Sequence, residues 1–276
     1  MTGTLYVVAT PIGNLADSSP RSIEILRSAD IVACEDTRTS RTLLAHHGIG
    51  ARTVALHAHN EREAGEKLLR ALRGGSNVAL VSDAGTPAIS DPGALLVAAA
   101  HREGLRVIPV PGPNAAIAAY SASGFVSDRF VFAGFLPAGS KSARNSSLDR
   151  LDLPWPVIFY EAPHRVLETV EALLARFGPA RELVLAREIT KKFEEVARMK
   201  LDAAPAWLAA GPHRQQGEFV LVLGPGEAKS LQSADAERIL GILLQKMPIS
   251  DAARLGSQIT GVPRKELYKS AVKRAK

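Results

Sequence analysis

Three loops rich in glycine and proline hold the residues of this sequence that are best suited to bind a small molecule. They cover residues 10–15, 82–93 and 110–115, and each follows a short apolar run that is typical of a β-strand. In open parallel sheets, ligands bind beyond the carboxyl ends of the strands, and glycine lets backbone N–H and C=O groups approach them closely. Three such loops at strand ends predict one shared pocket.

The composition of these loops excludes two common ligands. None of them contains the Gly-Lys-Ser/Thr ending of a phosphate-binding loop, and none has the GxGxxG spacing of a dinucleotide-binding turn. ATP and NAD are therefore poor candidates. A pocket built mostly from backbone, with the carboxylate of Asp83 and the small side chain of Ala115, is compatible with a zwitterionic molecule that carries an adenine.

A second group of residues could take up or donate a proton. Glu161 and His164 lie in one polar motif, and Glu188 and Lys191 lie in another. A positioned proton acceptor speeds attack by a hydroxyl by about 100-fold or more. Each residue also has a structural explanation: Glu161 could cap a helix, His164 could bond a loop, and Glu188 could pair with a neighbouring cation. Lys191 could act as a base only if its pKa were depressed.

Three further residues suit an extended anionic substrate. Asp36 and Arg38 follow the second predicted strand, and Arg165 lies in the motif of Glu161. The planar guanidinium of arginine binds phosphate through two parallel hydrogen bonds, so these residues predict a substrate-facing rim. The alternative is a surface ion pair between Asp36 and Arg38. No group of Cys and His residues has the spacing of a metal site.

The elements that must position these residues alternate between strands and helices. Strands are predicted at residues 5–9, 31–34, 53–56, 78–81 and 107–110, and then at 130–132, 157–160, 183–187 and 219–223. Helices are predicted from Ser19-Pro20 and over residues 61–73. The pattern breaks near Gly124. It predicts an N-terminal α/β domain at 1–122 with a mainly parallel sheet, and a second α/β domain at 123–224.

The C-terminal segment differs in both pattern and charge. After a linker at 224–232, a domain at 233–276 is predicted to hold a helix at 233–250, a second that Ser250 caps, and a third that starts at Pro263. This order resembles a helix-turn-helix, although a small packing bundle would look similar. Residues 229–276 contain ten Lys or Arg and four Asp or Glu, which accounts for the whole net charge of +6. A basic appendage on a neutral body favours a polyanionic partner.

Composition limits where the protein works. The chain has a single cysteine, Cys34, which favours a reducing cytoplasm. Its first residues lack the basic start and long apolar stretch of a signal peptide. The apolar run at 94–100 has seven residues, far fewer than the roughly 20 that span a bilayer. We therefore expect a cytoplasmic protein without membrane contact.

Six motifs follow one another along the chain. They are TPIGNL at 10–15, EDTR at 35–38, SDAGTP with SDPG at 82–93, VPGPN at 110–114, YEAPHR at 160–165 and REITKKFEE at 187–195. In this order they resemble the RsmI family, whose members methylate 16S ribosomal RNA at a cytidine 2′-hydroxyl. The resemblance covers nearly the whole chain and has one departure from the wider tetrapyrrole-methylase class, since a TPIG turn replaces the usual GxGxG-like turn after the first strand. That departure favours the RNA branch.

The resemblance implies a fold, a cofactor and partners. The fold is two α/β domains of the tetrapyrrole-methylase type with the cofactor cleft between them, plus a small helical C-terminal domain. The cofactor is S-adenosylmethionine, the substrate is small-subunit ribosomal RNA or the 30S subunit, and a homodimer is expected. A methyltransferase for small tetrapyrroles and a non-catalytic RNA-binding assembly factor are the alternatives. The implied cofactor-binding residues are Pro11, Asp83, Gly85, Thr86, Asn114, Ala115 and Tyr160.

Overall fold

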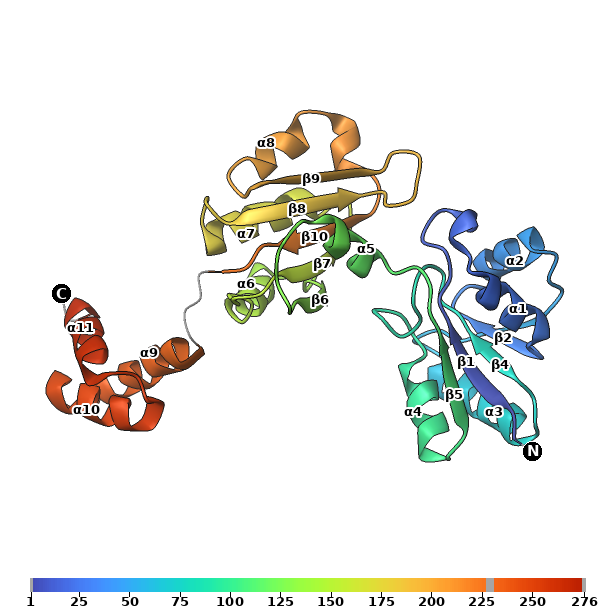
Figure 1. Cartoon of the computed structure of the whole chain (residues 1–276), viewed down its shortest axis with the longest axis horizontal. Coiled ribbons are helices and arrows are strands. Elements are labelled where there is room, and N and C mark those ends of the chain that lie inside the picture. Colours follow the sequence, from blue (N-terminus) through green and yellow to red (C-terminus); the bar gives the residue numbers. More distant parts are fainter. Residues whose placement is uncertain (1, 227–230, 275–276) are drawn as a thin grey trace.

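The computed structural model describes residues 2–226 and 231–274, which form two five-stranded sheets followed by three helices (Figure 1). The first sheet has the strand order β3-β2-β4-β1-β5, and every neighbouring pair is parallel. This confirms the mainly parallel sheet that the sequence predicts. Its strands are β1 (Thr4–Val8), β2 (Ile31–Cys34), β3 (Arg52–Ala55), β4 (Val78–Leu80) and β5 (Arg106–Val110).

Helices pack on both faces of the first sheet and bury two apolar clusters against it. Ser19 caps α1 as predicted, because its side chain accepts a hydrogen bond from the backbone N–H of Ser22. The helix predicted at 61–73 is α3, whose buried face includes Leu68, Leu69 and Leu72. The elements are the short 3₁₀ helix η1 (Leu15–Asp17), α1 (Pro20–Ser28), α2 (Thr37–His46), α3 (Glu61–Arg73) and α4 (Ala94–Arg102). Helix α5 (Ala115–Ala122) follows β5 but packs on the second sheet.

The second sheet is mixed and has the order β6-β7-β10-β8-β9, in which only the β6–β7 pair is parallel. Its edge strand β9 is absent from the sequence prediction. The residues of β9 alternate between half-buried and exposed positions and carry several charges, so the strand lacks the apolar run that marks the central strands. The strands are β6 (Val131–Phe135), β7 (Val157–Glu161), β8 (Glu182–Arg187), β9 (Glu195–Lys200) and β10 (Phe219–Leu223). The helices are α6 (Lys141–Asp149), α7 (Val166–Phe177), α8 (Ala204–Ala209) and the 3₁₀ helix η2 (Pro212–Gln215).

Arg198 on β9 holds the segment that joins the two sheets. Its Nη1 donates to the carbonyl oxygens of Ser123 at 3.2 Å and Gly124 at 2.9 Å. Its guanidinium lies 4.5 Å from the ring centroid of Phe125 and forms a salt bridge of 2.9 Å with Glu182. The connection between the sheets is therefore fastened to the β8–β9 hairpin.

The last three helices, α9 (Leu231–Leu244), α10 (Ile249–Thr260) and α11 (Arg264–Arg274), share a small apolar core of their own. The helix predicted at 233–250 is wrong in its extent, because α9 ends at Leu244 and Pro248 precedes α10. Proline cannot continue a helix, since it lacks the N–H group and clashes with the preceding turn. Ser250 lies inside α10 and does not cap it; its hydroxyl accepts from Arg264 Nη2 at 3.0 Å.

Two boundary predictions concern this part of the chain. The predicted linker at 224–232 is partly replaced by α9, which begins at Leu231, and residues 227–230 lie outside the described residues. The predicted domain ranges of 1–122, 123–224 and 233–276 stay a prediction. The first sheet falls within the first range, the second sheet falls within the second, and α10 and α11 fall within the third.

Candidate functional site

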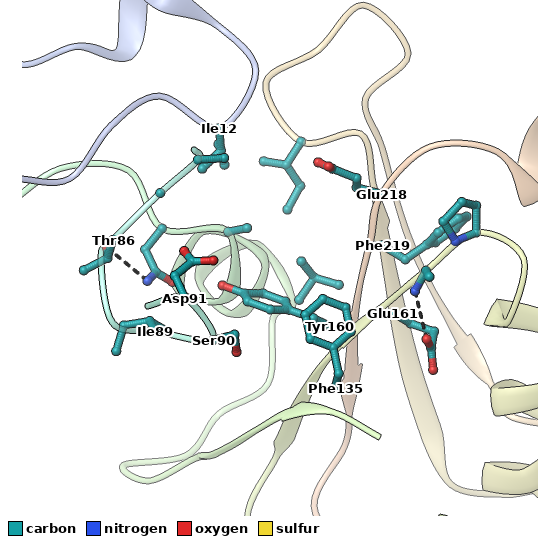
Figure 2. Close-up of a pocket in the computed structure, with 18 residues that line it drawn as sticks. Ile12, Thr86, Ile89, Ser90, Asp91, Phe135, Tyr160, Glu161, Glu218 and Phe219 are labelled. Carbon is teal, nitrogen blue, oxygen red and sulfur yellow. Dashed lines mark hydrogen bonds between the residues drawn. The ribbon is translucent and has the colours of Figure 1, made fainter. Parts of the chain in front are cut away.

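A cavity of about 390 Å³ lies where loops of the first sheet face the second sheet (Figure 2). We call it the first cavity. The loops that follow β1, β4 and β5 form one wall. The ends of β6 and β7, the start of β10 and the segments that follow β7 and β8 form the other. The lining residues are Ile12, Ala84, Gly85, Thr86, Ile89, Ser90, Asp91, Asn114, Ala115, Phe135, Tyr160, Glu161, Ala162, Pro163, Ile189, Glu218, Phe219 and Val220.

Hydrogen bonds tie the three predicted loops together. The backbones of Thr10 and Gly85 exchange two hydrogen bonds, with N–O distances of 2.8 and 3.1 Å. Thr86 Oγ1 donates to the carbonyl of Pro113 and accepts from Asn114 Nδ2, both at 3.2 Å. Asn114 also caps α5 through Ile117 N at 3.1 Å. The expectation that these loops share one pocket is confirmed, and Gly85, Thr86, Asn114 and Ala115 all line it.

The opposite wall of the first cavity is aromatic. The ring of Tyr160 lies 4.9 Å from that of Phe132 and 5.6 Å from that of Phe135, measured between centroids. Burial raises the pKa of the Tyr160 hydroxyl, which therefore stays protonated at neutral pH. Tyr160 presents a flat apolar face and a neutral hydroxyl to the cavity (Figure 2).

Asp91 is a lining residue that the sequence prediction does not single out. Burial, with repulsion from Glu35, raises the pKa of its carboxyl group to about 6, although a hydrogen bond from Ser82 opposes the shift. Ala88 and Ser90, in the same loop, both have φ of 65°, a left-handed conformation that side chains with a Cβ seldom adopt. Strained backbone of this kind is concentrated at binding sites. The SDPG motif contains Asp91 but does not reveal its burial.

A second cavity of about 440 Å³ adjoins the first. Pro11 and Asp83, both predicted to bind the cofactor, line this second cavity and not the first. The two cavities share Ile12, Ala84 and Glu218. The second cavity is lined by Thr10, Pro11, Ile12, Gly13, Leu15, Thr39, Ser40, Thr42, Leu43, Ser82, Asp83, Ala84, Lys191 and Glu218.

Lys191 forms an ion-pair network at the second cavity. Its Nζ lies 3.0 Å from Glu188 Oε1 and 2.9 Å from Glu218 Oε2, and Glu188 also accepts from the backbone N–H of Glu218. Partial burial acts to lower the pKa of Lys191, but the two carboxylates outweigh it and the pKa is raised. Burial acts to raise the pKa of Glu188, but these hydrogen bonds hold it below its ordinary value. The condition under which Lys191 could act as a base, a depressed pKa, is therefore not met.

Lys191 also brings the second domain against a loop of the first. A Cβ built on Gly13 would lie 2.5 Å from Lys191 Cγ, and Gly13 has φ of 148°. Only glycine fits this close approach without strain. The Gly13 loop and the Lys191 loop therefore meet at the edge of the second cavity.

Glu161 is tied into a buried network. Its side chain is fully buried and forms a salt bridge of 2.8 Å with Arg165 Nε, while its oxygens accept from Thr169 Oγ1 at 2.6 Å and from Ala162 N at 2.8 Å. Arg165 also donates to the carbonyl of Leu136. His164 is exposed and lines neither cavity. Glu161 does not cap α7, whose N-terminus has no side-chain cap hydrogen bond. Its role in the structure is to hold Arg165 and Thr169 at the start of that helix.

Asp36 and Arg38 pair with each other at 2.8 Å. Asp36 caps α2 by accepting from Arg38 N, and its own N–H donates to Asp83 Oδ1 at 3.0 Å. Hydrogen bonds from Arg38 lower the pKa of Asp36 to about 2. The predicted substrate residues are therefore not gathered: Asp36 and Arg38 lie beside the second cavity's Asp83, whereas Arg165 is part of the Glu161 network.

Two kinds of site are absent from residues 2–226 and 231–274. Within these ranges, no three side chains of His, Cys, Asp or Glu gather closely enough to hold a metal ion. None of the helices in the same ranges has the length and apolarity that crossing a bilayer requires.

The paired sheets and the cleft between them define the fold of the tetrapyrrole (corrin/porphyrin) methylases, whose family model matches residues 4–205. A second model, for the RsmI C-terminal HTH domain, matches residues 230–275. The chain belongs to the family of ribosomal RNA small subunit methyltransferase I. The relative of that name from Pseudomonas aeruginosa is 47% identical over 99% of this chain and 98% of its own length. The relative from Escherichia coli O157:H7 is 46% identical over 98% of this chain and 95% of its own length.

Solved structures share the fold at low sequence identity. A diphthine synthase is 17% identical with a TM-score of 0.63, over 80% of this chain and 89% of that one. A uroporphyrin III C-methyltransferase from Thermus thermophilus is 18% identical with a TM-score of 0.58, over 80% of this chain and 97% of that one. These likenesses cover the two sheets and confirm the predicted fold class, while the helical domain is confirmed by its own family model.

Proposed function

We propose that this chain uses S-adenosylmethionine to methylate the 2′-hydroxyl of a cytidine ribose in 16S ribosomal RNA. The observation that carries the proposal is the joining, in one chain, of a methylase cleft and a basic helical C-terminal segment. The names of the relatives support ribosomal RNA as the substrate. A cytoplasmic location and a homodimer belong to the same proposal.

The first cavity fits the proposed cofactor. Gly85 and Ala115 leave backbone accessible, Tyr160 offers a flat face for an adenine, and Asp91 offers a negative charge for a sulfonium or ammonium group. A uroporphyrin-III C-methyltransferase of the same fold is described as complexed with S-adenosyl homocysteine. The predicted cofactor roles of Gly85, Thr86, Asn114, Ala115 and Tyr160 agree with this placement. The predicted roles of Pro11 and Asp83 in cofactor binding require the cofactor to reach the wall that the two cavities share.

Alignment is the main task of this chain's residues in the proposed reaction. When bound, S-adenosylmethionine supplies a methyl group on a positively charged sulfur. The ribose oxygen displaces that sulfur in line, a neutral thioether leaves, and the hydroxyl proton passes to solvent water. Holding the reacting atoms in line is worth about 7 kcal/mol or more, and it requires no metal. Because its pKa is raised, Lys191 keeps its proton and is suited to donate a hydrogen bond to a ribose or phosphate oxygen. Glu188 holds Lys191 in place, and we assign both residues a positioning role.

The test of the proposal uses purified protein, labelled S-adenosylmethionine and 30S subunits from cells that lack the modification. We expect label in 16S ribosomal RNA and, by mass spectrometry, one ribose-methylated cytidine. Absence of label from free RNA and subunits alike would refute the proposal. Methylation of a precorrin with no RNA labelling would favour the tetrapyrrole alternative, and RNA binding without turnover would favour the assembly factor.

Filling the first cavity should weaken cofactor binding. Ala115 begins α5 and lines the cavity, so Ala115→Leu places three more carbons where the cofactor would lie. We expect the dissociation constant for S-adenosylmethionine to rise about 10- to 100-fold, as measured by calorimetry. Ser121→Leu, an exposed position on the same helix, is the matched control and should change the affinity less than twofold. Equal affinities in both variants would place the cofactor elsewhere.

The affinity for the cationic cofactor should also depend on pH through Asp91. Its folded-state pKa of about 6 lies above its ordinary value, so its negative charge is present above pH 6 and is lost as the pH falls through 6. We expect the dissociation constant to rise about tenfold between pH 7 and pH 5. Asp91→Asn should bind weakly at both values, with a flat profile. A wild-type profile that is equally flat would contradict this role.

A further inference from the structure

The second cavity has a lining that differs from that of the first. Hydroxyl groups come from the turn after β1, from the segment after β4 and from α2, and two leucines add apolar surface. Lys191 contributes an ammonium group, and Asp83 contributes a carboxylate. The hydroxyl-bearing residues are Thr10, Thr39, Ser40, Thr42 and Ser82, and the leucines are Leu15 and Leu43.

The position of this cavity is as informative as its lining. It meets the first cavity at Ile12, Ala84 and Glu218, so an atom at that shared wall can be reached from both sides. Methyl transfer in line requires the accepting oxygen and the sulfur to lie on opposite sides of the methyl group. If the donor occupies the first cavity, the acceptor must approach the shared wall from the second.

We infer that the second cavity holds the target nucleoside itself, turned out of the RNA, with its ribose at the wall shared by Ile12, Ala84 and Glu218. This inference rests on the proposed function. Enzymes that act on one nucleotide within a folded nucleic acid extrude it into a pocket, at a cost of a few kcal/mol for unstacking. A volume of about 440 Å³ falls in the range of small-molecule sites, which is roughly 300–1,000 Å³.

The chemistry of the lining suits a nucleoside. The leucines and Pro11 offer apolar contact to a flat base. The exposed hydroxyl of Thr39 can donate to the polar edge of the base, whereas the hydroxyls of Thr10, Thr42 and Ser82 already donate to backbone carbonyls and can only accept. Glu188 and Glu218 hold the ammonium group of Lys191 in place. An ammonium group suits a ligand that carries oxygen atoms and negative charge, as a ribose with its phosphate does. A nucleotide that stayed stacked in a helix would leave this lining without a partner.

The test fills the second cavity from the surface of α2. Thr39 is exposed and lines the cavity, so Thr39→Trp narrows it without disturbing the core. We expect kcat/KM for 30S methylation to fall at least 100-fold, while S-adenosylmethionine affinity by calorimetry changes less than threefold. Ala45→Trp places the same side chain on an exposed position of α2 outside the cavity, and it should keep wild-type activity.

The possible outcomes separate this inference from the function on which it rests. Wild-type protein that labels no ribosomal RNA overturns both. Wild-type activity with an equally active Thr39→Trp variant overturns the nucleoside site alone. Loss of cofactor affinity in Thr39→Trp, with Ala45→Trp normal, assigns the second cavity to the cofactor and also overturns the inference. Retained cofactor affinity shows that the variant is folded.

Discussion

Replacing Glu161 with alanine is expected to lower the free energy of unfolding of the second domain by about 3–5 kcal/mol. The side chain of Glu161 is fully buried, and that of Arg165 is 15% exposed, so the substitution would leave a guanidinium in the interior without its counter-ion. It would also remove the acceptor of the Thr169 hydroxyl. Urea unfolding followed by tryptophan fluorescence measures the effect, because Trp155 and Trp207 both belong to this domain.

An exposed ion pair of the same domain provides the control. Asp149 pairs with Arg176 at 2.7 Å, but its side chain is 63% exposed, so Asp149→Ala should cost less than about 1 kcal/mol. If Glu161→Ala were as stable as Asp149→Ala and yet inactive, the role of Glu161 would be catalytic and the structural interpretation would be wrong. The free energy of unfolding of Glu161→Gln should lie between those of the wild type and Glu161→Ala, because glutamine keeps the volume of the side chain but loses its charge.

Removing four positive charges from α11 should sharply weaken binding to the 30S subunit. Arg264, Lys265, Lys269 and Lys273 are all exposed, and replacing them with glutamine removes four possible phosphate contacts. Each lost contact to single-stranded RNA lowers the slope of log affinity against log salt by about 0.7, so we expect a decrease of about 3 in that slope. At physiological salt, the affinity should fall about 100-fold. Filter binding over a salt series measures both quantities.

The control for this variant removes as many charges from the first domain. Glutamine at Arg62, Lys67, Arg70 and Arg73 neutralises one exposed side of α3, at a distance from the C-terminal helices (Figure 1). We expect this control to change the salt slope by less than 1, and neither variant to alter cofactor affinity. Equal losses in both variants would mean that net charge, and not the basic C-terminal segment, governs the association.

The sequence predicts the first sheet well because its strands are short, apolar and separated by helices of regular period. It predicts the meeting of the Gly85 and Asn114 loops for the same reason, since the carboxyl ends of parallel strands share one edge. Strand β9 escapes prediction because an edge strand buries only part of each side chain. The sequence also does not predict the division of the cleft into two cavities, because the wall between them joins Ile12 and Ala84 of the first domain to Glu218 of the second.

The pKa values of the site residues also depend on tertiary contacts that the sequence motifs do not reveal. The motif around Lys191 contains a second lysine, Lys192, which allows a depressed pKa, but the folded chain brings in Glu218 from 27 residues away and raises it. The sequence around Asp91 indicates only a turn residue before proline, but in the folded chain burial and the neighbouring carboxylates raise the pKa of this group, which lines the first cavity. A local motif identifies the residue types, whereas their protonation states depend on tertiary packing.

Strand β9, which the sequence does not predict, has a structural role beyond the second sheet because it carries Arg198. Its guanidinium fastens residues 123–125 to the β8–β9 hairpin, and the loop of that hairpin supplies Ile189 to the first cavity and Lys191 to the second. Arg198 itself lines neither cavity, yet it helps to set the position of both walls. Small displacements of reacting groups have large effects on rates of transfer. A substitution of Arg198 can therefore alter how the two cavities are aligned without changing any residue that lines them.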